Sequence, residues 1–328
     1  MLLDATLTRA APHVHIQARA VATFGSRVQQ VQGTSPHMAS FTWESEFSVK
    51  SFVLGYVAAA MFSGCALAQT PIERGDYLIN GLMTCGNCHT PRGPGGVYDL
   101  SRQLSGGPQT WDEQTFKVKG ANITPDLETG IGKWSSADIK KAILTGFRPN
   151  GTQIAPMMPY GFYKVLTTDD VDAIVAYVQS VPAVRNAVEP PMYKSALYVS
   201  TPKGADQPMS EADMLDPVKR GFYLVTIAHC MECHTPLVND RHDFAQLGKG
   251  GQTFKGPFGV SSSRNITSHP TAGLGAWSDV EIKGAITQGL HKDGTKLKPP
   301  MQFHSYAKMT AQDLNAVVAY LRTVPPQE

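Results

Sequence analysis

Two pentapeptides of the form Cys-x-x-Cys-His, at residues 85–89 and 230–234, contain the side chains with the clearest chemical potential. The two cysteines of each motif lie three positions apart, so on one helical turn both thiols face the same side. They can then add to the two vinyl groups of one porphyrin, while the histidine that follows supplies an axial nitrogen to the iron. The spacing therefore predicts two covalently attached haems c.

Six residues follow from this prediction, with the histidines as proximal iron ligands: Cys85, Cys88, His89, Cys230, Cys233 and His234. Other uses of these cysteines fit less well. A structural zinc site needs four ligands, usually from paired motifs, and these two motifs begin 145 residues apart. A thioredoxin-like dithiol would accompany alternating strands and helices, which the sequence does not indicate. Structural disulfides would not require the same trailing histidine twice.

Methionine suits the second axial position of such a haem, because its soft thioether binds iron and raises the reduction potential. Met158 and Met301 stand at equivalent positions, 143 residues apart. Met157 is a weaker candidate because its counterpart is a proline, and His304 because its counterpart is a glycine. We therefore predict Met158 and Met301 as metal ligands, each opposite the histidine of its own pentapeptide.

An internal repeat organises the rest of the chain. Three segments recur at a constant offset of 143 residues: 122–124 at 265–267, 130–135 at 273–278, and 173–178 at 316–321. The repeat predicts two homologous domains, the N-terminal lobe at residues 69–185 and the C-terminal lobe at residues 217–328. Residues 186–216 contain several prolines and are predicted to be the linker.

The recurring Asn-Ile-Thr and Gly-x-Gly-x-Trp segments are predicted to line the haem pockets. A buried tryptophan N–H requires an acceptor, and a haem propionate is one. Packing without a special partner explains the tryptophans equally well.

Both lobes are predicted to be mostly helical. A Ser or Thr precedes an acid by three residues, as in a capping box, at four helix starts: Ser135 with Asp138, Thr167 with Asp170, Ser278 with Glu281, and Thr310 with Asp313. After both threonines, apolar residues recur at helical spacing as far as a Val-Pro pair. The predicted fold class is all-α, with two tandem cytochrome c domains that each surround one covalently bound haem.

Each lobe opens with an Arg-Gly-x-Tyr segment, whose glycine is Gly75 or Gly221. These are either simple helix-start glycines or points at which the first and last helices of a lobe cross closely. We favour the crossing, with Tyr177 and Tyr320 packed over the glycines, because glycine allows close approach of two backbones.

Residues 1–68 are predicted to be a disordered lead followed by a signal peptide. Lys50 precedes an apolar run and a small-x-small sequence at 66–68, which is the pattern of a secretory signal. An uncleaved membrane anchor is one alternative, and a lipoprotein with lipid on Cys65 is another. Export predicts a periplasmic protein, and an anchor or lipid would associate it with the inner membrane.

The overall composition is that of a globular protein, with 42% apolar and 17% charged residues. A net charge of only +2 argues against a nucleic-acid partner. The N-terminal lobe holds equal numbers of basic and acidic residues, whereas the C-terminal lobe has a balance of +4. Lys292, Lys296 and Lys298 precede Met301 and form either a solvated loop or a docking rim for an acidic partner.

Residues 122–143 and 156–184 resemble the cytochrome c subunits of membrane-bound bacterial alcohol, aldehyde and gluconate dehydrogenases. The resemblance extends over nearly all of residues 72–327. Those subunits usually have three haem domains and a C-terminal membrane helix, and similar two-haem chains accompany molybdenum hydroxylases. The resemblance implies an electron-accepting subunit rather than the site of substrate oxidation.

Two classes of function are compatible with two haems. The first is electron transfer without catalysis, from a periplasmic or membrane-bound dehydrogenase to a respiratory acceptor such as a cytochrome or an oxidase. The second is a two-haem redox enzyme, such as a peroxidase or a thiosulfate dehydrogenase, which needs an open or unusually ligated iron. Because each lobe supplies an aligned methionine, we expect electron transfer.

Overall fold

The computed structural model describes residues 69–256 and 258–328. The predicted disordered lead and signal peptide, including Cys65, lie outside these residues. Within them, no helix is both long and apolar enough to cross a membrane.

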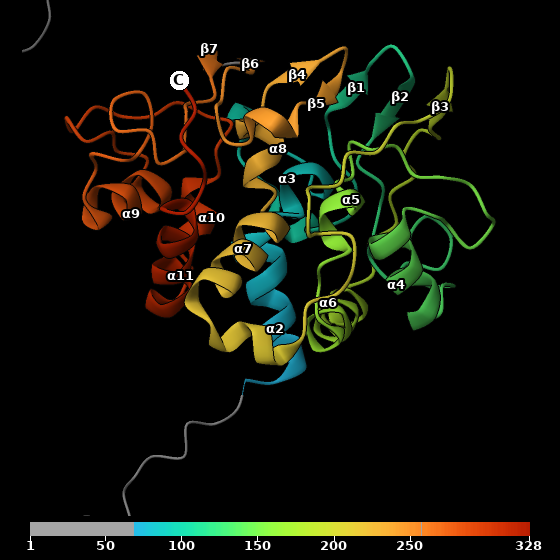
Figure 1. The fold of residues 1–328 in the computed structure, drawn as a ribbon. Helices are drawn as coiled ribbons and strands as arrows, with labels where there is room; N and C mark the ends of the chain where they lie inside the picture. Colours follow the sequence, from blue (N-terminus) through green and yellow to red (C-terminus); the bar gives the residue numbers. More distant parts are fainter. Residues whose placement is uncertain (1–68, 257) are drawn as a thin grey trace, which may run out of the picture. The chain divides into compact units, whose positions relative to one another are not determined.

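Each lobe is built from short helices joined by loops, turns and small sheets, and less than half of its residues are helical, so the prediction of mostly helical lobes is correct only in part (Figure 1). The helices of the N-terminal lobe are α2 (Pro71–Tyr77), the π-helical turn η1 (Leu78–Leu82), α3 (Gly86–His89), α4 (Ser136–Thr145), α5 (Tyr160–Tyr163) and α6 (Thr168–Ser180), with 3-10 turns η2 (Pro94–Gly96) and η3 (Leu100–Arg102). Those that follow are the 3-10 turn η4 (Glu211–Leu215), α7 (Pro217–Ile227), α8 (Cys230–His234), the 3-10 turn η5 (Phe244–Gln246), α9 (Asp279–Gln288), α10 (Phe303–Tyr306) and α11 (Ala311–Leu321).

Capping boxes begin the equivalent helices α4 and α9, as predicted. In α4, the Ser135 hydroxyl accepts from the Asp138 N–H at 3.1 Å, and the Asp138 carboxylate accepts from the Ser135 N–H at 3.0 Å. Ser278 and Glu281 make the same exchange in α9. Both helices end at a glycine in the left-handed region, which closes the last turn without strain.

The first and last helices of each lobe cross at a glycine, which confirms the predicted role of Gly75 and Gly221. A Cβ at Gly75 would lie 2.6 Å from the Tyr177 Cβ, and one at Gly221 would lie 2.6 Å from the Tyr320 Cβ. Both would lie closer still to a backbone carbonyl oxygen of the last helix. Any larger residue would therefore separate α2 from α6, or α7 from α11.

Small antiparallel sheets accompany the helices, so the prediction of an all-α fold is correct only in part. The strands are β1 (Thr110–Asp112), β2 (Phe116–Lys119), β3 (Met192–Tyr193), β4 (Leu237–Val238), β5 (Arg241–His242), β6 (Thr253–Gly256) and β7 (Gly259–Ser262). They pair in the orders β1-β2-β3, β4-β5 and β6-β7. Strands of two to four residues are too short to give an alternating pattern that sequence reasoning can detect.

Strand β3 belongs to the predicted linker, yet it completes the sheet of the N-terminal lobe. Phe116 pairs with Tyr193, and Lys117 pairs with Met192. The linker is therefore partly built into the lobe that precedes it.

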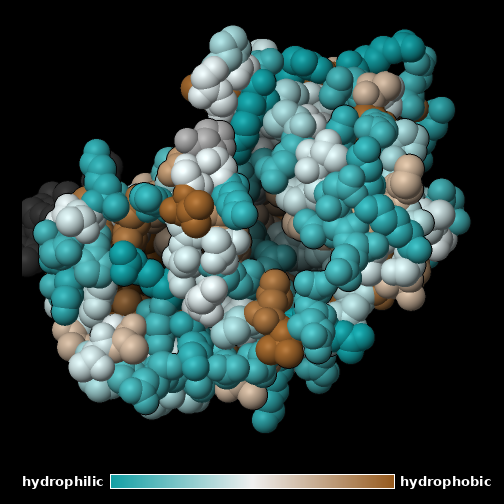
Figure 2. All heavy atoms as spheres, turned by 90° about the horizontal axis from the view of Figure 1, so that it is seen from above, coloured by the Kyte–Doolittle hydropathy of each residue, from teal (hydrophilic) through white to brown (hydrophobic). Residues whose placement is uncertain are grey.

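The two lobes belong to one compact unit, and residues of both contribute to one hydrophobic core cluster. Leu78 and Val165 contribute to this cluster from the N-terminal lobe, and Leu224 and Val317 contribute from the C-terminal lobe. The face seen in Figure 2 is mainly hydrophilic, with hydrophobic side chains in small separate patches around a central hollow.

Candidate haem sites

Both Cys-x-x-Cys-His segments lie on short helices, α3 and α8, just after the first long helix of each lobe. The residue before each first cysteine has a positive φ, 50° at Thr84 and 42° at His229. Such backbone is uncommon for residues other than glycine. It ends the first helix and allows α3 and α8 to start in a new direction. The same strained turn therefore positions both cysteine pairs.

The two motif histidines are held in one tautomer by equivalent hydrogen bonds. Nδ1 of His89 lies 2.7 Å from the carbonyl oxygen of Ala121, and Nδ1 of His234 lies 2.7 Å from that of Arg264. A carbonyl oxygen only accepts, so Nδ1 carries the hydrogen and Nε2 retains its lone pair. Burial lowers the pKa of both histidines, which favours the neutral ring. Each Nε2 is thus prepared to bind a metal ion.

Ala121 and Arg264, which sequence reasoning missed, stand immediately before the recurring Asn-Ile-Thr segments. The Asn122 side chain donates to the carbonyl oxygen of Val184 at 2.8 Å and accepts from the Thr124 N–H at 3.0 Å. Asn265 does the equivalent with residues 327 and 267. These asparagines fold the loop that presents the carbonyl to the histidine. Their constant offset in the sequence was the available signal, and their place in the haem-pocket wall stays a prediction.

The four motif cysteines form no disulfide in the described structure. Burial raises the pKa of Cys85, Cys88 and Cys230 to about 12, so these thiols are protonated at neutral pH. No group of three or more His, Cys, Asp or Glu side chains is arranged to hold a metal ion within the residues described. The raised pKa values do not support a reactive dithiol. These observations leave two unpaired thiols and one histidine in each lobe, the donor set that a c-type haem uses.

The methionine loops reach the cysteine helices through a tyrosine in each lobe. Tyr163 and Tyr306 each follow the predicted methionine ligand by five residues and are buried. Burial, followed by the proximity of the cysteines of the same lobe, raises their pKa well above the usual value. Met158 and Met301 are partly buried at the start of these loops. Their ligation of iron stays a prediction.

The two cysteine motifs also lie close to each other. Burial, and after it the charge of Glu232 from the second motif, raises the pKa of Cys88 in the first. His229, to which the sequence gives no role, pairs with Glu232 at 3.0 Å, and its Nε2 lies 3.4 Å from the Met83 carbonyl oxygen. Tyr98 of the N-terminal lobe contacts Gln302, the neighbour of Met301, at 3.3 Å. The lobes therefore meet beside both predicted haem sites.

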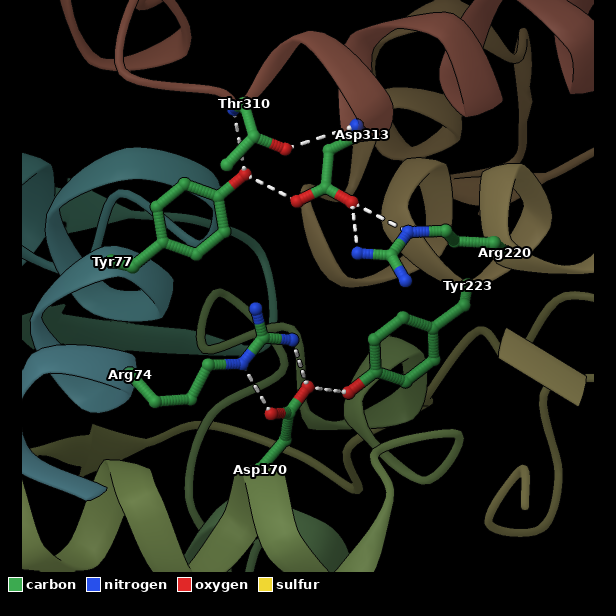
Figure 3. Close-up of polar contacts among 7 residues, drawn as sticks. All are labelled: Arg74, Tyr77, Asp170, Arg220, Tyr223, Thr310 and Asp313. Atoms are coloured by element: carbon green, nitrogen blue, oxygen red, sulfur yellow. Dashed lines mark hydrogen bonds and ion pairs between the residues drawn. The ribbon is translucent and has the colours of Figure 1, made fainter. Parts of the chain in front are cut away.

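A second junction between the lobes contains two crossed triads of Arg, Asp and Tyr (Figure 3). Asp170 accepts from Arg74 of its own lobe at 2.7 and 2.8 Å, and from the Tyr223 hydroxyl of the other lobe at 2.5 Å. Asp313 accepts from Arg220 of its own lobe at 2.6 Å, and from the Tyr77 hydroxyl of the other lobe at 2.6 Å. We call these six residues the clasp.

Only one of the two hydrogen bonds of a capping box forms at the starts of α6 and α11, because the carboxylates of Asp170 and Asp313 belong to the clasp. The hydroxyls of Thr167 and Thr310 accept from the Asp170 and Asp313 N–H groups, as predicted. The two carboxylates do not return to the threonine N–H groups, because they bind an arginine and a tyrosine.

Known proteins match the chain over both lobes. The cytochrome c family model matches residues 72–182 and again residues 218–325. The cytochrome c subunit of the quinone-dependent alcohol dehydrogenase of Gluconacetobacter polyoxogenes is 29% identical over 291 residues, 82% of this chain and 60% of that protein. The gluconate 2-dehydrogenase cytochrome c subunit of Pantoea cypripedii is 28% identical over 296 residues, 84% of this chain and 65% of that protein.

A shorter relative, the diheme cytochrome c-type protein of Cereibacter sphaeroides, is 30% identical over 256 residues. The match covers 74% of this chain and 83% of that protein. By contrast, the chain spans about three fifths of the length of the alcohol dehydrogenase subunit.

Proposed function

Because the chain belongs to the cytochrome c family and carries two haems c, we propose that it is a periplasmic electron carrier. It takes electrons from a partner dehydrogenase and passes them to a respiratory acceptor, and it does not itself oxidise the substrate. The two histidines with a fixed tautomer and a free Nε2, one in each lobe, are the observation that carries the proposal.

In this proposal, Cys85 and Cys88 hold one haem through thioether bonds, and Cys230 and Cys233 hold the other. His89 and His234 would supply an Nε2 ligand to the iron, and Met158 and Met301 would supply a thioether ligand. Haem supplies an iron that alternates between the ferrous and ferric states. The Ala121 and Arg264 carbonyl groups keep the histidine rings oriented, which second-shell hydrogen bonds generally do at metal sites.

A dehydrogenase is the proposed electron donor because relatives are named as cytochrome c subunits of alcohol and gluconate dehydrogenases. The domains of this carrier are the lobes at residues 69–185 and 217–328, joined by the linker at 186–216. A signal peptide before residue 69 delivers it to the periplasm.

The two lobes take different partners in this scheme. The N-terminal lobe has equal numbers of basic and acidic residues, and the linker residues Lys194 and Glu189 pair with Asp112 and Lys119 of that lobe. The C-terminal lobe has a charge balance of +4 and the loop of Lys292, Lys296 and Lys298. A neutral surface suits a lasting contact with the dehydrogenase. A basic rim suits brief encounters with an acidic acceptor.

The test is spectroscopic and enzymatic. We expect two haem masses on the exported protein, low-spin spectra for both haems in both oxidation states, and no turnover of peroxide or thiosulfate. Rapid reduction by a periplasmic dehydrogenase, followed by oxidation by a cytochrome or an oxidase, completes the assignment. A high-spin haem with peroxide turnover would instead identify a two-haem enzyme.

A further inference from the structure

We propose that Tyr77 and Tyr223 are positioning residues for electron transfer between the two haems, because their hydroxyl groups fix one lobe against the other. The proposal rests on the two-haem carrier described above. In the step concerned, one haem is oxidised as the other is reduced, and neither atoms nor protons are transferred. The two tyrosines act without contacting either predicted haem site.

The geometry of the clasp crosses the lobe boundary twice (Figure 3). Helix α2 provides Arg74 to the carboxylate of its own lobe and Tyr77 to the carboxylate of the other lobe. Helix α7 does the same with Arg220 and Tyr223. Arginine and tyrosine lie three positions apart, on one side of each helix. Each first helix is therefore linked to the last helices of both lobes.

The two cross-lobe hydrogen bonds are short and buried. The Asp170 side chain is 8% exposed and that of Asp313 is 1% exposed. Carboxylates only accept, so the tyrosine hydroxyls must donate, and hydrogen bonds to a charged acceptor are stronger than neutral ones. Burial and the hydrogen bond to Asp313 raise the pKa of Tyr77, which keeps this donor protonated at physiological pH.

Asp170 and Asp313 do not accept a hydrogen bond from the N-cap threonine N–H of their own helix, which is the local partner available to them. In α4 and α9, the equivalent acid returns to its own helix cap. In α6 and α11, Asp170 and Asp313 instead reach an arginine and the tyrosine of the other lobe. Two long-range contacts of the same kind, at equivalent places in the repeat, show that the junction is a specific feature of the fold.

The clasp lies before the cysteine motifs along the first helices, with Tyr77 eight residues before Cys85 and Tyr223 seven residues before Cys230. Tyr77 ends α2, η1 continues to Leu82, and the first motif begins at Cys85. The contacts between lobes beside the motifs are longer, at 3.4 Å for His229 to Met83 and 3.3 Å for Tyr98 to Gln302. The hydrophobic core cluster that the lobes share also holds them together, but apolar packing is non-directional, so small rotations between the lobes remain open. The clasp supplies the second fixed point, and the rate of electron transfer falls exponentially as the distance between haems increases.

Tyr77→Phe, Tyr223→Phe and the double variant provide the test, because each change removes one oxygen and keeps the Arg–Asp pair within each lobe. Tyr177→Phe is the matched control, since its hydroxyl accepts from Asn80 of the same lobe at 2.8 Å. Electron exchange between the haems is measured in half-reduced protein from the exchange broadening of haem methyl NMR signals. Pulsed EPR of the ferric protein gives the distribution of iron–iron distances.

We expect the double variant to exchange electrons up to about a hundredfold more slowly, with a broader distance distribution, because each of the two charge-assisted hydrogen bonds favours the docked lobes by about tenfold. Each single variant should show a smaller effect, and the control should match the wild type. Unchanged exchange with a lowered unfolding midpoint would reduce the clasp to a stabilising contact and overturn the proposal.

Two further outcomes are informative. If the double variant fails to fold, the test rests on the two single variants. Electron-exchange rates in both single variants equal to the rate in Tyr177→Phe would then overturn the proposal. Wild-type protein with fewer than two haems would refute the carrier function itself, independently of the tyrosines.

Discussion

Strands β2 and β7 occupy equivalent places in the repeat, with Phe116 and Gly259 as their first residues, but their surroundings differ. Strand β2 pairs with β1 on one side and with the linker strand β3 on the other. Strand β7 pairs with β6, and no further strand joins it among the described residues. The Lys298 ammonium group instead lies 3.4 Å from the Val260 carbonyl oxygen of β7.

The interiors of the lobes differ much less than these surfaces. Both have the strained turn before the first cysteine, the histidine held by a carbonyl group, the glycine crossing and half of the clasp. The same internal geometry thus positions both cysteine motifs, whereas the outer surfaces of the two lobes differ. A linker strand completes the sheet edge of one lobe, and Lys298 borders the corresponding edge of the other.

The largest expected effect comes from removing one cysteine pair. Cys85→Ser with Cys88→Ser should leave one haem, in the C-terminal lobe, and Cys230→Ser with Cys233→Ser should leave one in the N-terminal lobe. Thioether attachment requires the thiols, so mass spectrometry should show one added haem mass instead of two. If either pair of changes removes both haems, the lobes do not mature independently, and haem extractable from wild type by acid acetone would contradict covalent attachment.

Removal of the predicted methionine ligands should have the next largest effect. Met158→Ala and Met301→Ala should each abolish one thioether–iron charge-transfer band and lower the potential of that haem, because Met/His ligation keeps it high. The measurement is a spectrum combined with a redox titration, and Met157→Ala is the control. Loss of the band in Met157→Ala would show that the ligand in the N-terminal lobe is misassigned by one residue.

Substitution of the crossing glycine should destabilise the two lobes to a similar extent. Gly75→Ala and Gly221→Ala should each lower the free energy of unfolding by about 2–3 kcal/mol, because the added Cβ overpacks a close backbone contact. Denaturant titration of the haem-loaded protein measures this. Gly284→Ala in α9 is the control, since nothing lies within 4 Å of its added Cβ, and alanine should stabilise that helix by up to about 1 kcal/mol. A large loss of unfolding free energy in only one of the two variants would show that the interiors of the lobes are not equivalent.

The surface lysines should have the smallest effect, and it should depend on salt. Lys292→Gln, Lys296→Gln and Lys298→Gln together should slow oxidation by an acidic acceptor severalfold at low ionic strength, while reduction by the dehydrogenase is unchanged. The difference should shrink at physiological salt, where charges are screened over about 8 Å. Lys133→Gln with Lys141→Gln in the N-terminal lobe is the control. Slower reduction instead would reverse the assignment of partners to lobes.

Much of this protein could be predicted from sequence because its features are local. The spacing of Cys85 and Cys88 is a property of one helical turn, and the capping box of Ser135 and Asp138 spans three residues. The repeat then supported each local inference with a second instance and selected Met158 over Met157. The glycine crossings were also predictable, because the Arg-Gly-x-Tyr segment opens both lobes and glycine allows two backbones to approach closely.

Contacts between distant residues were decided only by the tertiary structure. Tyr77 and Asp313 are separated by 236 residues, and Tyr223 and Asp170 by 53, so no periodic pattern relates them. Asp170 shows the physical reason. Its position in the sequence fits a helix cap, but a buried carboxylate takes the strongest donors within reach, and packing of the lobes determines which donors those are. The sequence thus specified the attachment sites, and the fold decided how the two sites are held together.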